Sequence, residues 1–97
     1  MPYTSETKNT IRNLIVEVLK THGPLKFGFM MHELSILCTQ KQNNQELWLF
    51  GDGIDLPLLF ASSQESWNLS YELVNNLIKD KIINQREAEE ERLLVLL

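Results

Sequence analysis

Three side chains in this 97-residue chain could bind a soft metal or form a nucleophile–base pair: His22, His32 and Cys38. A structural zinc site needs four ligands, usually in closely spaced pairs, and the sequence contains no such pair. On one helix, residues six apart point about 120° away from each other, so Cys38 and His32 cannot work as a catalytic pair. We therefore expect Cys38 to be a small core residue, His22 to end a helix and His32 to lie half-exposed on another.

Two further segments resemble binding loops but lack residues that such loops require. The segment Asp52-Gly53-Ile54-Asp55 lacks the alternating acids and the closing glutamate of a calcium loop. Gly51 and Gly53 are not followed by the Gly-Lys-Ser/Thr of a phosphate-binding loop. We expect no catalytic residue, no metal site and no cofactor, and hence a non-enzymatic protein.

Length and composition predict a single domain spanning residues 1–97. The chain is 43% hydrophobic and 23% charged, which is typical of a folded globule. No window approaches the ~18 consecutive apolar residues that a membrane span needs, and the polar start does not resemble a secretion signal. Because Cys38 is the single cysteine, no internal disulfide is possible. These features predict a cytoplasmic protein that contacts no membrane.

Hydrophobic periodicity predicts two helices in the first half. A one-faced apolar stripe followed by His22-Gly23-Pro24 predicts a helix over 5–22. A second stripe, from Phe27 to Cys38, predicts a helix over about 28–39, although residues 26–29 could instead form a short strand. The polar segment 39–45 has no period and predicts an exposed loop.

The second half carries weaker signals. Residues 47–50 predict a strand entering a turn, and Asp55 can cap a short helix, with a hairpin strand as the alternative. Residues 62–65 resemble a capping box and Asn68 is a second candidate cap for a helix that ends near Asp80. The tail can be two strands joined by an acidic turn, or one helix that starts after Asn84.

Residues 55–97 resemble the C-terminal part of a winged helix-turn-helix domain. In that resemblance Leu56–Ser63 is the short helix, Gln64–Trp67 the turn and Asn68–Asp80 the recognition helix. Ile82-Ile83 enters a two-stranded wing and Arg92–Leu97 returns from it, while helix 5–22 is the family's first helix. The resemblance implies an α+β fold, mostly helical, with a small antiparallel β-sheet.

Three sets of residues are candidate sites. The first is the polar face of helix 68–80, which comprises Asn68, Tyr71, Glu72, Asn75, Asn76 and Lys79. The second is the charged tip of the expected wing, which comprises Arg86, Glu87, Glu89, Glu90 and Glu91. The third is the apolar C-terminus, Leu93, Leu94, Val95, Leu96 and Leu97, which needs burial on more than one side, in a central strand or in an interface.

Charge decides between the two functions that these sites suggest. A DNA footprint that contacts about 6–10 phosphates needs as many donors in one place. The chain has net charge −4 and nine Lys and Arg residues in all, and those near the expected recognition helix are Lys79, Lys81, Arg86 and Arg92. We therefore expect a small regulatory or adaptor protein that contacts another protein, or itself as a homodimer. The alternative is a winged-helix DNA-binding transcriptional regulator.

Overall fold

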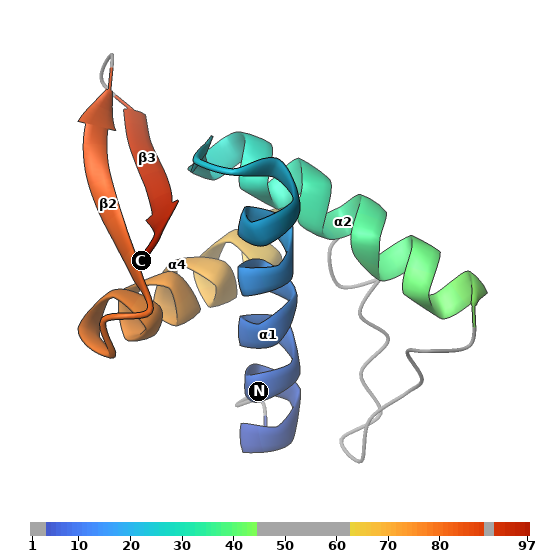
Figure 1. The fold of residues 1–97 in the computed structure, drawn as a ribbon. Coiled ribbons are helices and arrows are strands. Elements are labelled where there is room, and N and C mark those ends of the chain that lie inside the picture. Colours follow the sequence, from blue (N-terminus) through green and yellow to red (C-terminus); the bar gives the residue numbers. More distant parts are fainter. Residues whose placement is uncertain (1–3, 45–62, 89–90) are drawn as a thin grey trace.

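The computed structural model describes residues 4–44, 63–88 and 91–97. Its elements, in chain order, are α1 (Ser5–His22), β1 (Leu25–Lys26), α2 (Phe27–Asn43), α4 (Ser63–Lys79), β2 (Ile83–Ala88) and β3 (Glu91–Leu96). The three strands form an antiparallel sheet in the order β1-β3-β2. The expected class, α+β and mostly helical with a small antiparallel sheet, is therefore confirmed. In Figure 1, α1 crosses α4, and α2 and the β2–β3 hairpin lie on either side of α1.

Helix α1 has the bounds that its sequence predicts, because both of its ends carry strong signals. At the start, the Thr4 hydroxyl oxygen accepts a hydrogen bond from the backbone N–H of Thr7 at 3.2 Å. At the end, Gly23 adopts a φ of 77°, which favours glycine, and its N–H donates to the Leu19 carbonyl at 2.9 Å. The chain then enters the two-residue strand β1.

Helix α2 is longer than the sequence predicts. The expected loop at 39–45 is wrong for residues 39–43, which form the last turn of the helix. The Thr39 hydroxyl donates to the Ser35 carbonyl at 3.1 Å, and Lys41 forms an ion pair with Glu17 of α1 at 3.3 Å. This end of α2 lies beyond the apolar core, so it needs no hydrophobic stripe. The alternative strand at 26–29 is also wrong beyond Lys26, because α2 begins at Phe27.

Helix α4 begins earlier than the resemblance implies. The resemblance makes Gln64–Trp67 a turn, and Asn68 was the second candidate cap, but both lie inside α4. The start of α4 at Ser63 agrees instead with the first candidate, the capping box at residues 62–65. Its end is close to the expected Asp80. There Lys81 takes a left-handed φ of 61°, while its N–H and that of Ile82 donate to carbonyls of the last helical turns, each at 3.0 Å. This is the hydrogen-bond pattern of a Schellman motif, with lysine at the position where glycine is usual.

The C-terminal segment forms two strands, so the alternative of a terminal helix is wrong. β2 pairs with β3 from Ile83↔Leu96 to Ala88↔Glu91, and β1 pairs with β3 through Leu25↔Leu94 and Lys26↔Leu93. β3 is therefore the central strand of the sheet. This position accounts for an unbroken apolar run, because side chains on both faces of a central strand can be covered.

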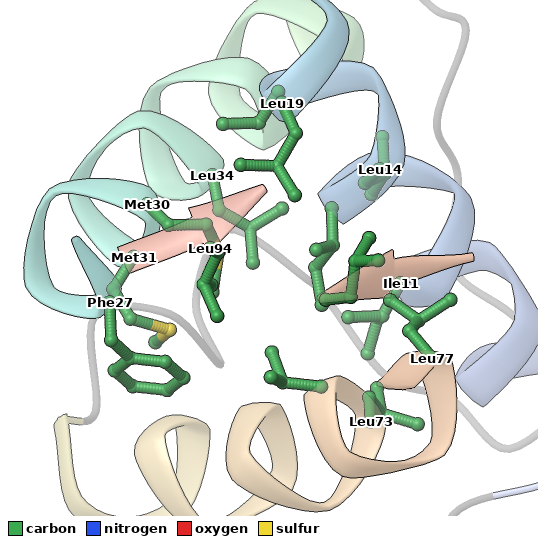
Figure 2. Close-up of a cluster of buried hydrophobic side chains, with 14 of the residues drawn as sticks. Ile11, Leu14, Leu19, Phe27, Met30, Met31, Leu34, Leu73, Leu77 and Leu94 are labelled. Atoms are coloured by element: carbon green, nitrogen blue, oxygen red, sulfur yellow. The ribbon is translucent and has the colours of Figure 1, made fainter. Parts of the chain in front are cut away.

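The core gathers side chains from every helix and from the sheet (Figure 2). Its fully buried members include Ile11 and Ile15 of α1, Met30 and Leu34 of α2, and Leu73 and Leu77 of α4, together with Ile83 and Leu94 of the sheet. Figure 2 shows Phe27 at the edge of this cluster, with its ring above α4. At this edge the ring of Phe27 in α2 contacts the rings of Trp67 and Tyr71 in α4.

Several expectations fall outside the described residues. These are the strand at 47–50, the short helix after Asp55 as far as residue 62, and the positions of Glu89 and Glu90. Within the described part of the chain, none of the helices combines the length and the apolar character that a membrane span requires.

Candidate functional site on helix α4

The outward face of α4 carries the predicted polar residues. Asn68, Tyr71, Glu72, Asn75 and Lys79 are all exposed, and Asn76 is half-buried beside them. The opposite face of the helix is buried against the core, through Leu69, Leu73, Val74 and Leu77. The helix therefore presents one continuous polar and aromatic surface, and this surface has two sides of different chemistry.

The side of α4 that faces α1 is held by ion pairs, and we call it the ionic flank. Lys8 Nζ lies 3.2 Å from Glu72 Oε1, and Arg12 Nη2 lies 2.6 Å from Asp80 Oδ2, directly after the helix. All four side chains are partly open to solvent. The predicted residue Glu72 is thus engaged within the molecule, and it takes up a cation that could otherwise face a phosphate.

The side of α4 that faces α2 is built from aromatic rings, and we call it the aromatic flank. Tyr71 stacks on Phe27 of α2, with ring centroids 4.2 Å apart and planes 7° from parallel. Trp67 contacts the same phenylalanine at 4.9 Å and a tilt of 58°. Phe27 is 6% exposed, whereas Trp67 and Tyr71 are 36% and 39% exposed. A buried ring therefore fixes two rings that remain open to solvent.

Two hollows border the aromatic flank. The described lining of one, of about 330 Å³, consists of Gln64, Trp67, Asn68 and Tyr71. The described lining of the other, of about 470 Å³, consists of Lys26, Gly28, Phe29 and His32. Gly28, which lines the second hollow, lies near the Trp67 ring, which lines the first: a Cβ at Gly28 would be 3.9 Å from that ring. Phe29 is 62% exposed, so three partly or largely exposed aromatic side chains, those of Phe29, Trp67 and Tyr71, line the two hollows.

The other two candidate sites lie in the hairpin. Arg86 and Glu87 are in β2 and Glu91 begins β3. In the apolar tail, Leu94 is fully buried, Leu93, Val95 and Leu96 are half-buried, and Leu97 is 70% exposed. Much of the tail is therefore covered within one molecule. Of the residues predicted as an interface, Leu97 is the most exposed, and its N–H donates to the carbonyl of the exposed Ile82 at 3.1 Å.

The residues considered as metal ligands or as a nucleophile–base pair form no common site in the described part of the chain. Cys38 is buried on α2, and this burial raises the pKa of its thiol to about 12, which leaves it protonated and unreactive. His32 is exposed on the same helix, and His22 contacts Glu33 at 3.2 Å in a surface pair. Among the described residues, no group of histidine, cysteine and acidic side chains could hold a metal ion.

Sequence reasoning found the polar face of α4 but missed the support beneath it. Trp67 and Tyr71 are four residues apart, which places them on the same side of a helix. That spacing was a usable signal. Their contact with Phe27, forty residues earlier, depends on how α2 packs, and no local pattern shows it. Comparisons of the chain with protein-family models, with curated proteins and with solved structures gave no match.

Proposed function

We propose that this chain is a non-enzymatic regulatory or adaptor domain that binds another protein through the exposed face of α4. The observation that carries the proposal is the aromatic flank, where Trp67 and Tyr71 are open to solvent but fixed in place by Phe27. Tryptophan and tyrosine are enriched at protein interfaces and dominate the binding energy of many of them.

The arrangement of these rings favours binding over simple surface exposure. A side chain that is already held in one orientation loses less conformational entropy when a partner covers it. The stacked contact between Tyr71 and Phe27 supplies that restraint on one ring, and the tilted contact of Trp67 supplies it on the other. Asn68 and Gln64, which lie 3.4 Å apart at the edge, can form the polar rim that interfaces usually have.

We also propose that the fold is winged-helix-like. The element order, with a helix, a short strand, two helices and a two-strand hairpin among the described elements, supports this proposal. The contact between α4 and β2 supports it as well, because it places the hairpin beside the helix that precedes it. In this proposal α4 occupies the place of the recognition helix and β2–β3 the place of the wing.

DNA binding is the second candidate function. The observation that favours it is the run of Asn68, Asn75 and Lys79 along the exposed face of α4, since asparagine and lysine can bond to base edges and phosphates. The ionic flank weakens it, because Lys8 and Arg12 are already paired with carboxylates. Protein binding is therefore the better-supported function.

Affinity capture on the full-length protein tests the proposal. Wild-type protein and the Tyr71→Ala variant are immobilised separately, incubated with lysate of the source cells and compared by quantitative mass spectrometry. We expect a small set of proteins to be retained by the wild type and reduced at least about tenfold by Tyr71→Ala. Lys20→Ala, an exposed change on α1, is the matched control and should retain the same set.

Two parallel measurements cover the alternatives. Fluorescence anisotropy with duplex DNA at about 0.15 M salt should show weak, non-selective binding. Sequence-selective binding tighter than about 0.1 μM would replace protein binding by DNA binding as the function. Sedimentation of the pure protein tests a homodimer, whose loss in Tyr71→Ala would identify a second copy of the chain as the partner.

A further inference from the structure

We propose that the side chain of Asn84 prevents the outer edge of strand β2 from pairing with a second copy of the chain. The juxtaposition that carries this inference is the Asn84 carboxamide against the next backbone amide: Asn84 Oδ1 accepts a hydrogen bond from the Gln85 N–H at 2.9 Å. The inference concerns the β2–β3 hairpin and not the exposed face of α4, so it is independent of the proposed function.

Strand β2 lies at one end of the sheet. The order is β1-β3-β2, and among the described elements no strand pairs with the side of β2 that faces away from β3, which we call the open edge. In Figure 1, β2 is the strand of the hairpin that lies farther from α1. An edge strand presents unpaired N–H and C=O groups, which can pair with a strand of another molecule unless something blocks them.

The pairing with β3 shows which backbone groups face the open edge. The Leu97 N–H donates to the Ile82 carbonyl at 3.1 Å, so the ladder begins with a hydrogen-bonded pair. In an antiparallel ladder, hydrogen-bonded and non-hydrogen-bonded pairs alternate, so every second residue of β2 directs its N–H and C=O away from β3. These residues are Ile83, Gln85 and Glu87. The N–H that Asn84 occupies is therefore the central one of the open edge.

The bond from Gln85 to Asn84 makes the addition of a strand less favourable. A joining strand needs the Gln85 N–H as a donor, but the Asn84 oxygen already lies at the position of the acceptor. The joining strand must therefore displace the carboxamide, and it exchanges one hydrogen bond for another instead of gaining a new one. Local side-chain bonds of asparagine compete with β-ladders in this way.

The sequence of β2 limits the registers in which it could pair with itself. Two identical antiparallel strands are related by a two-fold axis, and the alternation of hydrogen bonds makes that axis pass through a residue and its own copy. An axis at Arg86 would place two arginine residues directly opposite each other, and an axis at Glu87 two glutamates, which is unfavourable. An axis at Gln85 or at Asn84 opposes no like charges, but both registers need the Gln85 N–H as a donor. Asn84 thus blocks the registers that charge leaves open.

Sedimentation velocity on the full-length protein at about 10–100 μM tests the inference. Asn84→Val removes the acceptor oxygen and introduces a residue that favours strands, so we expect it to self-associate at least about tenfold more tightly than the wild type. Gln85→Val is the matched control, because it makes a similar change at the neighbouring exposed position and keeps Asn84. Its association should stay within about twofold of the wild-type value. Asn84→Asp retains a side-chain oxygen acceptor and should also behave as the wild type.

A second substitution identifies the edge that the new contact uses. Proline has no N–H, and it is tolerated in an edge strand where that N–H would face outward. Gln85→Pro, added to Asn84→Val, should therefore return the association to within about twofold of the wild-type value, while circular dichroism still shows a folded chain.

Amide hydrogen exchange of the wild type tests the bond to Asn84 without any substitution. The Gln85 amide should exchange at least about tenfold more slowly than the same amide in an unstructured peptide, because its N–H is bonded within the chain. This measurement does not depend on whether the variants fold.

Several results would overturn the inference. One is an Asn84→Val variant that associates no more tightly than the wild type, and another is a Gln85→Val variant that associates as tightly as Asn84→Val. A dimer of Asn84→Val that survives Gln85→Pro would show that pairing does not use this N–H. A freely exchanging Gln85 amide, or a wild-type dimer that Gln85→Pro dissociates, would show that Asn84 does not block the edge.

Discussion

The two flanks of α4 join the same helix to two different neighbours by two different kinds of contact. On the ionic flank, Lys8 and Arg12 of α1 reach acids on and directly after α4, and every partner is partly in solvent. On the aromatic flank, Phe27 of α2 is almost fully buried and supports two rings of α4. Both flanks thus border one exposed surface.

The difference indicates where binding energy is available. Exposed ion pairs contribute little to stability and are screened by salt, since water competes for both charges. Covering an aromatic side chain removes a large apolar area from water and is little affected by salt. A partner gains little by competing for Glu72, but it gains much by covering Trp67 and Tyr71. The ionic flank positions α4, and the aromatic flank is the part that a partner can use.

Removing most of strand β3, which contacts both α1 and α2, should have the largest effect on stability. β3 contacts both α1 and α2, so deletion of Leu93–Leu97 takes away the central strand and the buried Leu94. We expect the truncated chain to lose its cooperative unfolding transition by circular dichroism. The control is Leu97→Ala, which changes an exposed residue and should alter the free energy of unfolding by about 0.5 kcal/mol or less. A truncated chain that still unfolds cooperatively would show that the tail is dispensable.

The next largest effect should come from the ring beneath the aromatic flank. Phe27→Ala removes a buried side chain and leaves Trp67 and Tyr71 unsupported, and it should lower the free energy of unfolding by about 3–5 kcal/mol. Urea denaturation measures this change. Phe29→Ala, two residues away but largely in solvent, should cost about 0.5 kcal/mol or less. Equal losses in the two variants would mean that Phe27 does not support the flank.

The buried thiol of Cys38 reports on how firmly α2, the helix that carries Phe27, is packed. Burial raises the pKa of Cys38 from 9.0 to about 12, so its thiolate should be scarce at pH 8 and alkylation slow. In the unfolded chain the thiol loses its proton near pH 9, whereas the folded chain holds it. Between these two pH values, deprotonation stabilises the unfolded chain alone. The free energy of unfolding therefore keeps its full value below pH 9 and falls as the pH rises toward 12.

Two measurements follow from that pKa. Between pH 8 and pH 10, wild-type protein should lose about 1.4 kcal/mol more stability than Cys38→Ala, which has no thiol to titrate. Alkylation at pH 8 should accelerate in Phe27→Ala, which loosens α2, and should stay slow in Lys8→Ala. Fast alkylation of the wild type would contradict the burial of Cys38.

The sequence predicts those elements whose ends carry local signals. Helix α1 is correct to the residue because Thr4 and Gly23 mark its limits. The hairpin was one of two alternatives for the tail, since its two apolar runs separated by charged residues fitted a terminal helix as well. The error at 39–43 has a different cause. That turn of α2 is held by Lys41 and Glu17, which are distant in sequence, so its polar composition suggests a loop.

Of the candidate site, the exposed face of α4 was predictable from the sequence, but its division into two flanks was not. The exposed residues of α4 follow from helical periodicity, and Asn68, Tyr71 and Asn75 all lie on the expected face. The division of that face into two flanks depends on contacts with α1 and α2 across more than forty residues of chain. Helical period places a side chain on a face, but it does not identify the neighbour that the face meets.

The smallest effect should come from the ionic flank, and it is the most direct test of the comparison. A double-mutant cycle on Lys8→Ala and Glu72→Ala isolates the pair from changes in helix propensity, because each single variant carries its own such change. Both side chains are partly exposed, so the coupling energy should be about 0.2–1 kcal/mol and should shrink further in 1 M salt. The corresponding cycle on Phe27→Leu and Tyr71→Leu keeps side chains of moderate size and removes the stacked pair. Its coupling should be about 0.5–1.5 kcal/mol and should persist in 1 M salt. A salt-sensitive aromatic coupling, or an ionic coupling well above the aromatic one, would reverse the assignment of the two flanks. The stronger coupling of α4 would then be with α1 and not with α2.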